Sequence, residues 1–154
     1  MSDDGFQDLQ HSLVSIRDTW TAASPIYQYY FPRTWTAVLA RFLGLSPRPN
    51  FRLYSAELAA ISQRTQAAMS AAGQAFKEIE ASGPLPASAR QFATLVYNQV
   101  RIESEALLAF TAHIQALMAQ DPLALHFVQL MQQRQREAEA NRAQLILAGP
   151  PRFD

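Results

Sequence analysis

The 154-residue chain contains no cysteine, which excludes disulfide bonds, thiolate zinc sites and cysteine nucleophiles. Lysine is almost absent as well, since Lys77 is the single lysine among thirteen basic residues. Acidic and basic side chains balance to a formal net charge of zero, so no overall field attracts nucleic acid or an anionic membrane. No apolar run approaches the roughly 20 residues that a membrane-spanning helix needs.

The first ten residues, MSDDGFQDLQ, are acidic and lack the apolar stretch of a secretory signal. An apolar content of 49% with only 17% charged residues argues against a disordered chain. A chain of this length can bury a substantial core within a single domain. We therefore expect one cytoplasmic helical domain over residues 1–149, followed by a short tail over residues 150–154.

Motifs of enzymes and metal proteins are also missing. A two-metal carboxylate site in a helical bundle needs Glu-x-x-His segments, and the sequence has none. Its three histidines, His11, His113 and His126, fall in separate segments. The glycines are too dispersed for a phosphate-binding loop, and no Gly-x-Ser-x-Gly turn occurs. We therefore predict no catalytic, metal-binding or cofactor-binding residues and no enzyme activity, with an uncharacterised bundle enzyme as an alternative.

Breaks at proline and glycine divide the chain into five helix-length segments, none with the alternating pattern of a strand. The first segment starts near residues 3–4 and is predicted to end at Pro25. The second is short, with Pro32 in its first turn and Gly44 after its end. The third starts at Asn50 and keeps a 3.5-residue, coiled-coil period over four heptads. Its apolar seam consists of Phe51, Tyr54, Leu58, Ile61, Thr65, Ala68, Ala72, Ala75 and Ile79.

The fourth segment, about residues 86–120, is apolar around most of its circumference. One stripe consists of Val96, Val100, Glu103, Leu107, Phe110, Ile114 and Leu117. A second stripe consists of Leu95, Gln99, Ile102, Ala106, Ala109 and His113. Two stripes predict a central helix that is contacted from two sides. The fifth segment is predicted to have Asp121 as N-cap, Pro122 in its first turn and Gly149 past its end.

These segments predict an all-α protein, an elongated antiparallel bundle of three long helices. The N-terminal helix would be a fourth member, and the short second helix would lie at one end. The long seam and the two-sided fourth helix also predict self-association into a homo-oligomer. Two polar residues interrupt the stripes of the fourth helix. We expect Glu103 to pair with an arginine of a neighbouring helix, and His113 to be a hydrogen-bonded packing residue.

Residues 19–45 are rich in aromatic side chains and contain the sequence TWTA twice. Residues 19–56 include four arginines and no aspartate or glutamate. Enrichment in aromatic residues and arginine with depletion of acids is typical of an interface core. The predicted partner-binding residues are Tyr27, Tyr29, Tyr30, Arg33, Trp35, Leu39, Arg41 and Phe42.

Three kinds of partner fit this composition. A groove in a protein would take Trp35, Leu39 and Phe42 as anchors, and these side chains would then be exposed in the single chain. A lipid or polymer surface would take the aromatic residues at its boundary. Single-stranded nucleic acid would stack on the tyrosines, but it is least favoured because the positive charge is modest. Alternatively, the aromatic residues would simply close the end of the bundle.

The third to fifth segments are rich in alanine and glutamine. In this composition they resemble bacterial phasins, which coat storage-polymer granules. The resemblance implies a surface-coating protein as an alternative. From the residues themselves we predict a non-enzymatic interaction or scaffold protein that self-associates and presents residues 27–42 to a protein partner.

Overall fold

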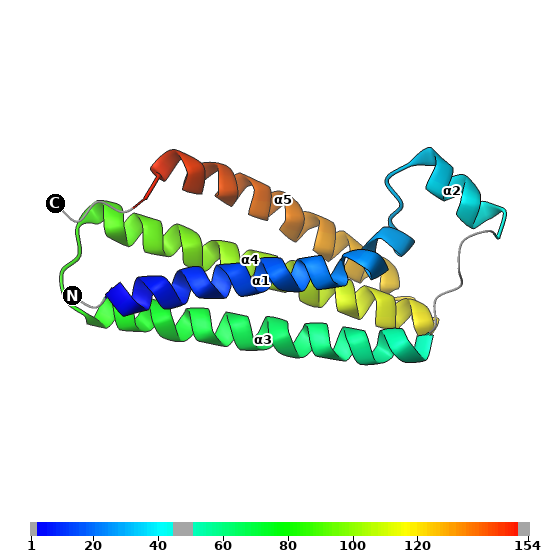
Figure 1. Ribbon diagram of the computed structural model, residues 1–154, viewed down its shortest axis with the longest axis horizontal. Coiled ribbons are helices and arrows are strands. Elements are labelled where there is room, and N and C mark those ends of the chain that lie inside the picture. Colours follow the sequence, from blue (N-terminus) through cyan, green and yellow to red (C-terminus); the bar gives the residue numbers. More distant parts are fainter. Residues whose placement is uncertain (1–2, 45–50, 151–154) are drawn as a thin grey trace.

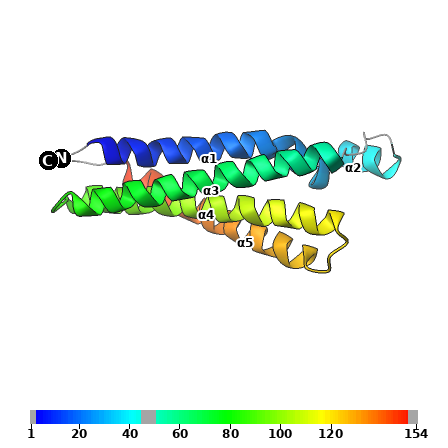
Figure 2. The same ribbon diagram turned by 90° about the horizontal axis from the view of Figure 1, so that it is seen from below.

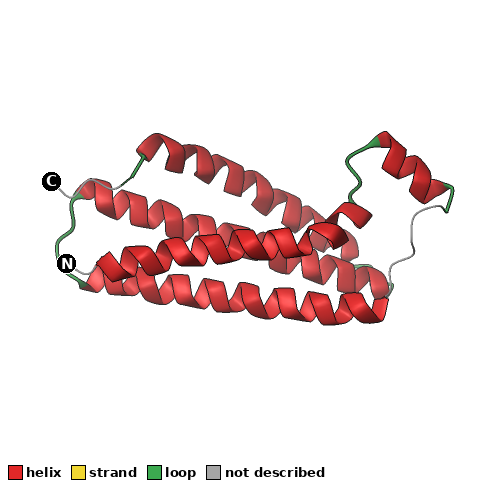
Figure 3. Cartoon of the chain, in the orientation of Figure 1, coloured by secondary structure: helices red, strands yellow, loops and turns green. Residues whose placement is uncertain are grey.

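The computed structural model describes residues 3–44 and 51–150. Within these ranges it contains five helices and no strand, as Figure 3 shows. The helices are α1 (Asp3–Tyr30), α2 (Trp35–Phe42), α3 (Phe51–Ala81), α4 (Ala87–Met118) and α5 (Ala124–Ala148). The predicted all-α fold is therefore confirmed. No helix in the described ranges combines the length and apolarity needed to cross a membrane.

The four long helices form an elongated antiparallel bundle (Figures 1 and 2). α1 and α4 run in one direction, and α3 and α5 run in the other. α1 and α3 pack against each other and against α4, whereas α5 packs closely on α4 alone in the described part of the chain. α4 is thus the central helix, contacted from two sides, as its two stripes predict. The short α2 projects beyond one end of the bundle.

The core lies between α1, α3 and α4. Its largest fully buried side chains include Leu9, Ile16, Ile26, Leu58, Leu107, Phe110 and Ile114. The α3 seam is buried from Leu58 to Ile79, and Tyr54 is partly buried. The side chain of Phe51 lies outside the described part. The middle of the seam, from Thr65 to Ala75, consists of small residues that are buried.

Helix α1 continues through Pro25 to Tyr30, so the prediction that the first helix ends at Pro25 is wrong. Proline inside a helix costs about 3 kcal/mol, because it lacks an N–H and clashes with the preceding turn. Here the following turn places Ile26 in the core and the ring of Tyr27 at 5.5 Å from that of Phe110. Burial of these two side chains offsets the cost of the proline.

The predicted glycine stops are confirmed, but two predicted helix starts are wrong. α2 begins at Trp35, beyond Pro32. α5 begins at Ala124 with Leu123 as N-cap, beyond Asp121 and Pro122. Gly44 and Gly149 lie beyond the ends of α2 and α5 with φ of 69° and 66°, a backbone region that favours glycine. At the start of α5, Leu123 N–H donates to Asp121 Oδ1 over 2.9 Å. The predicted cap of α3, Asn50, lies outside the described residues, as does the tail from residue 151.

Candidate functional site

The two TWTA sequences lie in different environments. The first, residues 19–22, belongs to α1, where Trp20 is partly buried with its ring centroid 6.1 Å from Tyr27 and 6.3 Å from Phe110. The second, residues 34–37, begins α2, where the Trp35 side chain is 74% exposed. In the described part of the chain, α2 packs closely on no other helix. The aromatic stretch therefore forms two sites rather than one surface.

The packed half of the stretch closes one end of the core. The ring of Tyr27 lies 5.0 Å from Phe31, and Phe31 lies 5.9 Å from His113. His113 in turn hydrogen-bonds through Nδ1 to the carbonyl oxygen of Ala124 over 2.7 Å, which ties α4 to the start of α5. The alternative in which the aromatic residues close the bundle thus holds for Trp20, Tyr27, Tyr30 and Phe31, which pack against the core. His113 is a hydrogen-bonded packing residue, as predicted.

The exposed half of the stretch is one face of α2. Trp35, Leu39 and Phe42 are separated by four and three residues, so they share a helix face. All three are exposed, Phe42 by 86%, which confirms the expected exposure of these side chains in the single chain. Val38 and Leu43 are exposed beside them. Exposed apolar patches of this kind are common at interaction sites.

Further exposed apolar residues lie at the α4–α5 turn, which is at the same end of the bundle as α2 (Figures 1 and 2). We name these residues together the apolar end: Trp35, Val38, Leu39, Phe42, Leu43, Leu117, Leu123 and Leu125. Eight of the eleven large apolar side chains exposed in the described ranges belong to it. The three leucines of the turn were not predicted as site residues. In the sequence they extend the apolar segments of α4 and α5, which are typical of buried positions.

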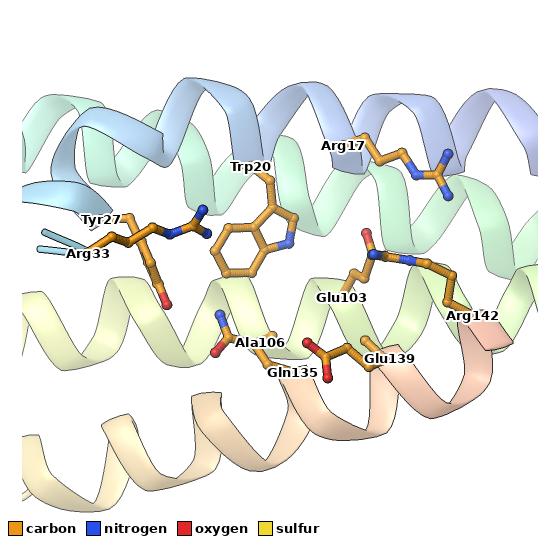
Figure 4. A pocket seen from close by; sticks show the side chains of 10 residues that line it. Arg17, Trp20, Tyr27, Arg33, Glu103, Ala106, Gln135, Glu139 and Arg142 are labelled. Carbon is orange, nitrogen blue, oxygen red and sulfur yellow. The ribbon is translucent and has the colours of Figure 1, made fainter. Parts of the chain in front are cut away.

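Of the predicted site residues, Trp35, Leu39 and Phe42 belong to the apolar end, and two others line a pocket. Tyr27 and Arg33 line a pocket of about 340 Å³ between α1, α4 and α5 (Figure 4). Tyr29 and Tyr30 are partly buried and meet edge to face with their ring centroids 5.1 Å apart. Arg41 belongs to α2, but its side chain lies outside the described part. Arg33 therefore faces the pocket and is not part of the exposed face of α2.

Several polar side chains join α4 to α5 beside this pocket. Arg142 Nη2 donates to Glu103 Oε1 over 3.0 Å, and Gln99 Nε2 donates to the same oxygen. Asn141 Nδ2 donates to Gln99 Oε1 over 2.8 Å and to the Leu95 carbonyl oxygen over 2.9 Å. Glu103 is only 4% exposed and pairs with an arginine of a neighbouring helix, as predicted. In the residues that the structure describes, no group of three His, Asp or Glu side chains is placed to bind a metal.

Comparisons with protein-family models, with curated proteins and with solved structures found no match. The resemblance to phasins rests on composition alone. Function is therefore inferred from the apolar end and from the pocket.

Proposed function

We propose that the protein is a non-enzymatic interaction protein that binds a protein partner through its apolar end, with α2 as the anchoring helix. One observation supports this most directly: Trp35, Leu39 and Phe42 are exposed along one face of a helix that packs closely on no other helix in the described ranges. Amphipathic helices bind grooves through anchors with this spacing. Tryptophan is also among the residues that contribute most at protein interfaces.

The composition of α2 favours a protein groove over a lipid or polymer surface. Helices that lie on membranes carry several basic residues on the polar face, which attract anionic headgroups. The eight residues of α2, WTAVLARF, include Arg41 as the single charge. The helix is about 12 Å long, which suits a groove that surrounds it. The same lack of positive charge disfavours nucleic acid, whose affinity depends on several phosphate contacts.

The double substitution Trp35→Ala/Phe42→Ala tests this function. Because both side chains are exposed, we expect the free energy of unfolding to change by less than about 1 kcal/mol. A protein retained from native cell extract by the immobilised wild-type chain would be identified, purified and titrated against both chains. We expect its affinity for the double variant to fall at least about 100-fold, as for loss of two interface anchors. A loss of several kcal/mol in stability would instead show that α2 is part of the folded core.

The matched control is Ile146→Ala/Leu147→Ala, which removes two exposed apolar side chains at the far end of α5. This variant should keep the affinity of the wild type. Sedimentation with lipid vesicles tests the alternative, a lipid surface as the partner of α2. Binding of vesicles by the wild type that is lost in the α2 variant, with no protein retained, would replace the protein partner with a lipid surface.

Self-association stays a prediction. One of its motives, the second stripe of α4, is accounted for within a single chain, because α5 covers that side of α4. Sedimentation at micromolar concentration should show at least a dimer. A dimer that dissociates in the Trp35→Ala/Phe42→Ala variant would identify a second copy of the chain as the partner of the apolar end. A monomer at every concentration would contradict self-association.

A further inference from the structure

The pocket of Figure 4 lies over α4, where α1 and α5 flank that helix without packing closely on each other. Its volume of about 340 Å³ is at the lower end of the range of small-molecule sites. α1 contributes Trp20, and α5 contributes Gln135 and Glu139. α4 contributes Ala106 at the base. The three helices are joined by the core and by the polar contacts of Arg142 and Asn141, so the walls of the pocket are formed before any ligand arrives.

Two small residues leave space beside an aromatic wall. Ala106 on α4 and Ala138 on α5 are both buried at the pocket, and neither has atoms beyond Cβ to fill it. Trp20 is held in place by its ring contacts with Tyr27 and Phe110, while part of its own surface stays open. A rigid, partly exposed indole favours a flat ring stacked against it.

The charges of the pocket favour an anion with a single negative charge. Arg17, Arg33 and Arg142 face Glu103 and Glu139, which leaves one excess positive charge. Arg142 already pairs with Glu103. Arg17 and Arg33 form no ion pair within the described residues, so both guanidinium groups are available. A second negative charge on the ligand would be repelled by the two glutamates, which disfavours phosphates.

We propose that this pocket binds a small planar aromatic carboxylate, with its ring against Trp20 and its carboxylate on Arg33. Figure 4 shows the guanidinium of Arg33 beside the Trp20 indole, where one ligand reaches both. Arginine matches a carboxylate with two parallel N–H donors, and this fixes the orientation of the ring. The pocket is separate from the apolar end, so this site does not depend on the proposed protein partner.

Calorimetric titration with 1-naphthoate tests the site on the full chain. We expect saturable binding of one molecule per chain. The Arg33→Gln variant should bind about tenfold more weakly, as expected for loss of a hydrogen bond to a charged group. The neutral analogue of 1-naphthoate, 1-naphthamide, should bind the wild type about tenfold more weakly than 1-naphthoate, for the same reason. Arg33 is exposed, so the melting temperature of Arg33→Gln should equal that of the wild type.

Two control variants locate the binding. Arg64→Gln removes an exposed arginine of α3 away from the pocket and should bind 1-naphthoate as the wild type does. Trp35→Ala/Phe42→Ala should also bind unchanged, because its substitutions lie on α2. The proposal would be overturned if 1-naphthoate showed no saturable binding with a Kd below about 1 mM, which corresponds to a binding free energy of about 4 kcal/mol. Equal affinity for the amide, or a loss of binding in the α2 variant but not in Arg33→Gln, would also overturn it.

Discussion

The two sides of α4 are packed by different chemistry. The side toward α1 and α3 is apolar, and Val100, Leu107, Phe110 and Ile114 on it are completely buried. The side toward α5 also contains apolar contacts, such as fully buried Met131, but it places Gln99 and buried Glu103 against Asn141 and Arg142. One helix therefore takes part in an apolar core and, on an adjacent part of its circumference, in a contact that includes buried hydrogen bonds.

The two sides of α4 therefore contribute differently, one mainly to the stability of the fold and the other to the alignment of α5 along α4. Apolar burial is non-directional, so the α1–α3 side contributes most of the free energy without fixing how the helices are aligned. The polar side satisfies its hydrogen bonds in one alignment of α5 along α4, and polar contacts of this kind add more specificity than stability. That alignment also places Ala138 and Glu139 at the pocket. The geometry of the pocket thus depends on the polar side of α4.

The largest effect is expected from the apolar side. Leu107→Ala removes a fully buried side chain from the core and should lower the free energy of unfolding by about 2–5 kcal/mol. The matched control is Leu147→Ala, whose side chain is 87% exposed and should change stability by less than about 0.5 kcal/mol. Urea denaturation measures both. A loss below about 0.5 kcal/mol for Leu107→Ala would contradict the apolar packing of this side.

A smaller effect is expected from the polar side. Asn141→Ala removes the donor to Gln99 Oε1 and to the Leu95 carbonyl oxygen, and it should cost about 1–3 kcal/mol because a buried acceptor loses its partner. Hydrogen exchange should show a larger loss of protection in α5 than in α3. Gln144→Ala, at an exposed position on α5, is the control. An equal loss of protection in every helix would show that Asn141 does not stabilise the position of α5 in particular.

Helical periodicity could predict that α4 is buried on two sides because it reports which positions of a helix face inward. It placed Glu103 in the stripe of Val100 and Leu107, whereas the partner of Glu103, Arg142, lies on α5. It also marked Glu103 and His113 as buried polar residues that need partners. Periodicity does not report which neighbour covers each side. Its boundary for α1 was wrong because the burial of Ile26 and Tyr27 lies outside the local signal of Pro25.

The division of the aromatic stretch could not be predicted for a related reason. Trp20 and Trp35 both lie in the sequence TWTA. Their surroundings differ because a core residue, Phe110, packs against Trp20. The pocket was missed because its charged residues are far apart in the sequence. Arg17 and Glu139 fall on polar faces of separate helices, and only the arrangement of α1 and α5 around α4 brings them together.

The smallest effect is expected at the exposed edge of the polar side. Arg134 lies between two glutamates, with Nη1 2.7 Å from Glu137 Oε2 and Nε 2.7 Å from Glu105 Oε2. The hydrogen bond from Arg134 lowers the pKa of the Glu137 carboxyl below its ordinary value. A lowered pKa means that the folded state favours the carboxylate. This stabilisation is therefore complete above the pKa of the unfolded chain, and it is lost as the pH falls through the lower pKa of the folded chain.

The Glu137→Gln variant removes that contribution. Because the pair is partly exposed and spans one helix turn, we expect a loss of only about 0.2–0.5 kcal/mol near neutral pH. The wild type and the variant should begin to converge in stability as the pH falls below the pKa of the unfolded glutamate, about 4.5, and should be equal below the lower pKa of the folded chain. Glu139→Gln is the control, because Glu139 forms no ion pair in the described ranges. Urea titrations of the wild type and of Glu137→Gln across this pH range measure the difference in their free energies of unfolding. A difference that grows as the pH falls would show that the Arg134–Glu137 pair does not stabilise the fold.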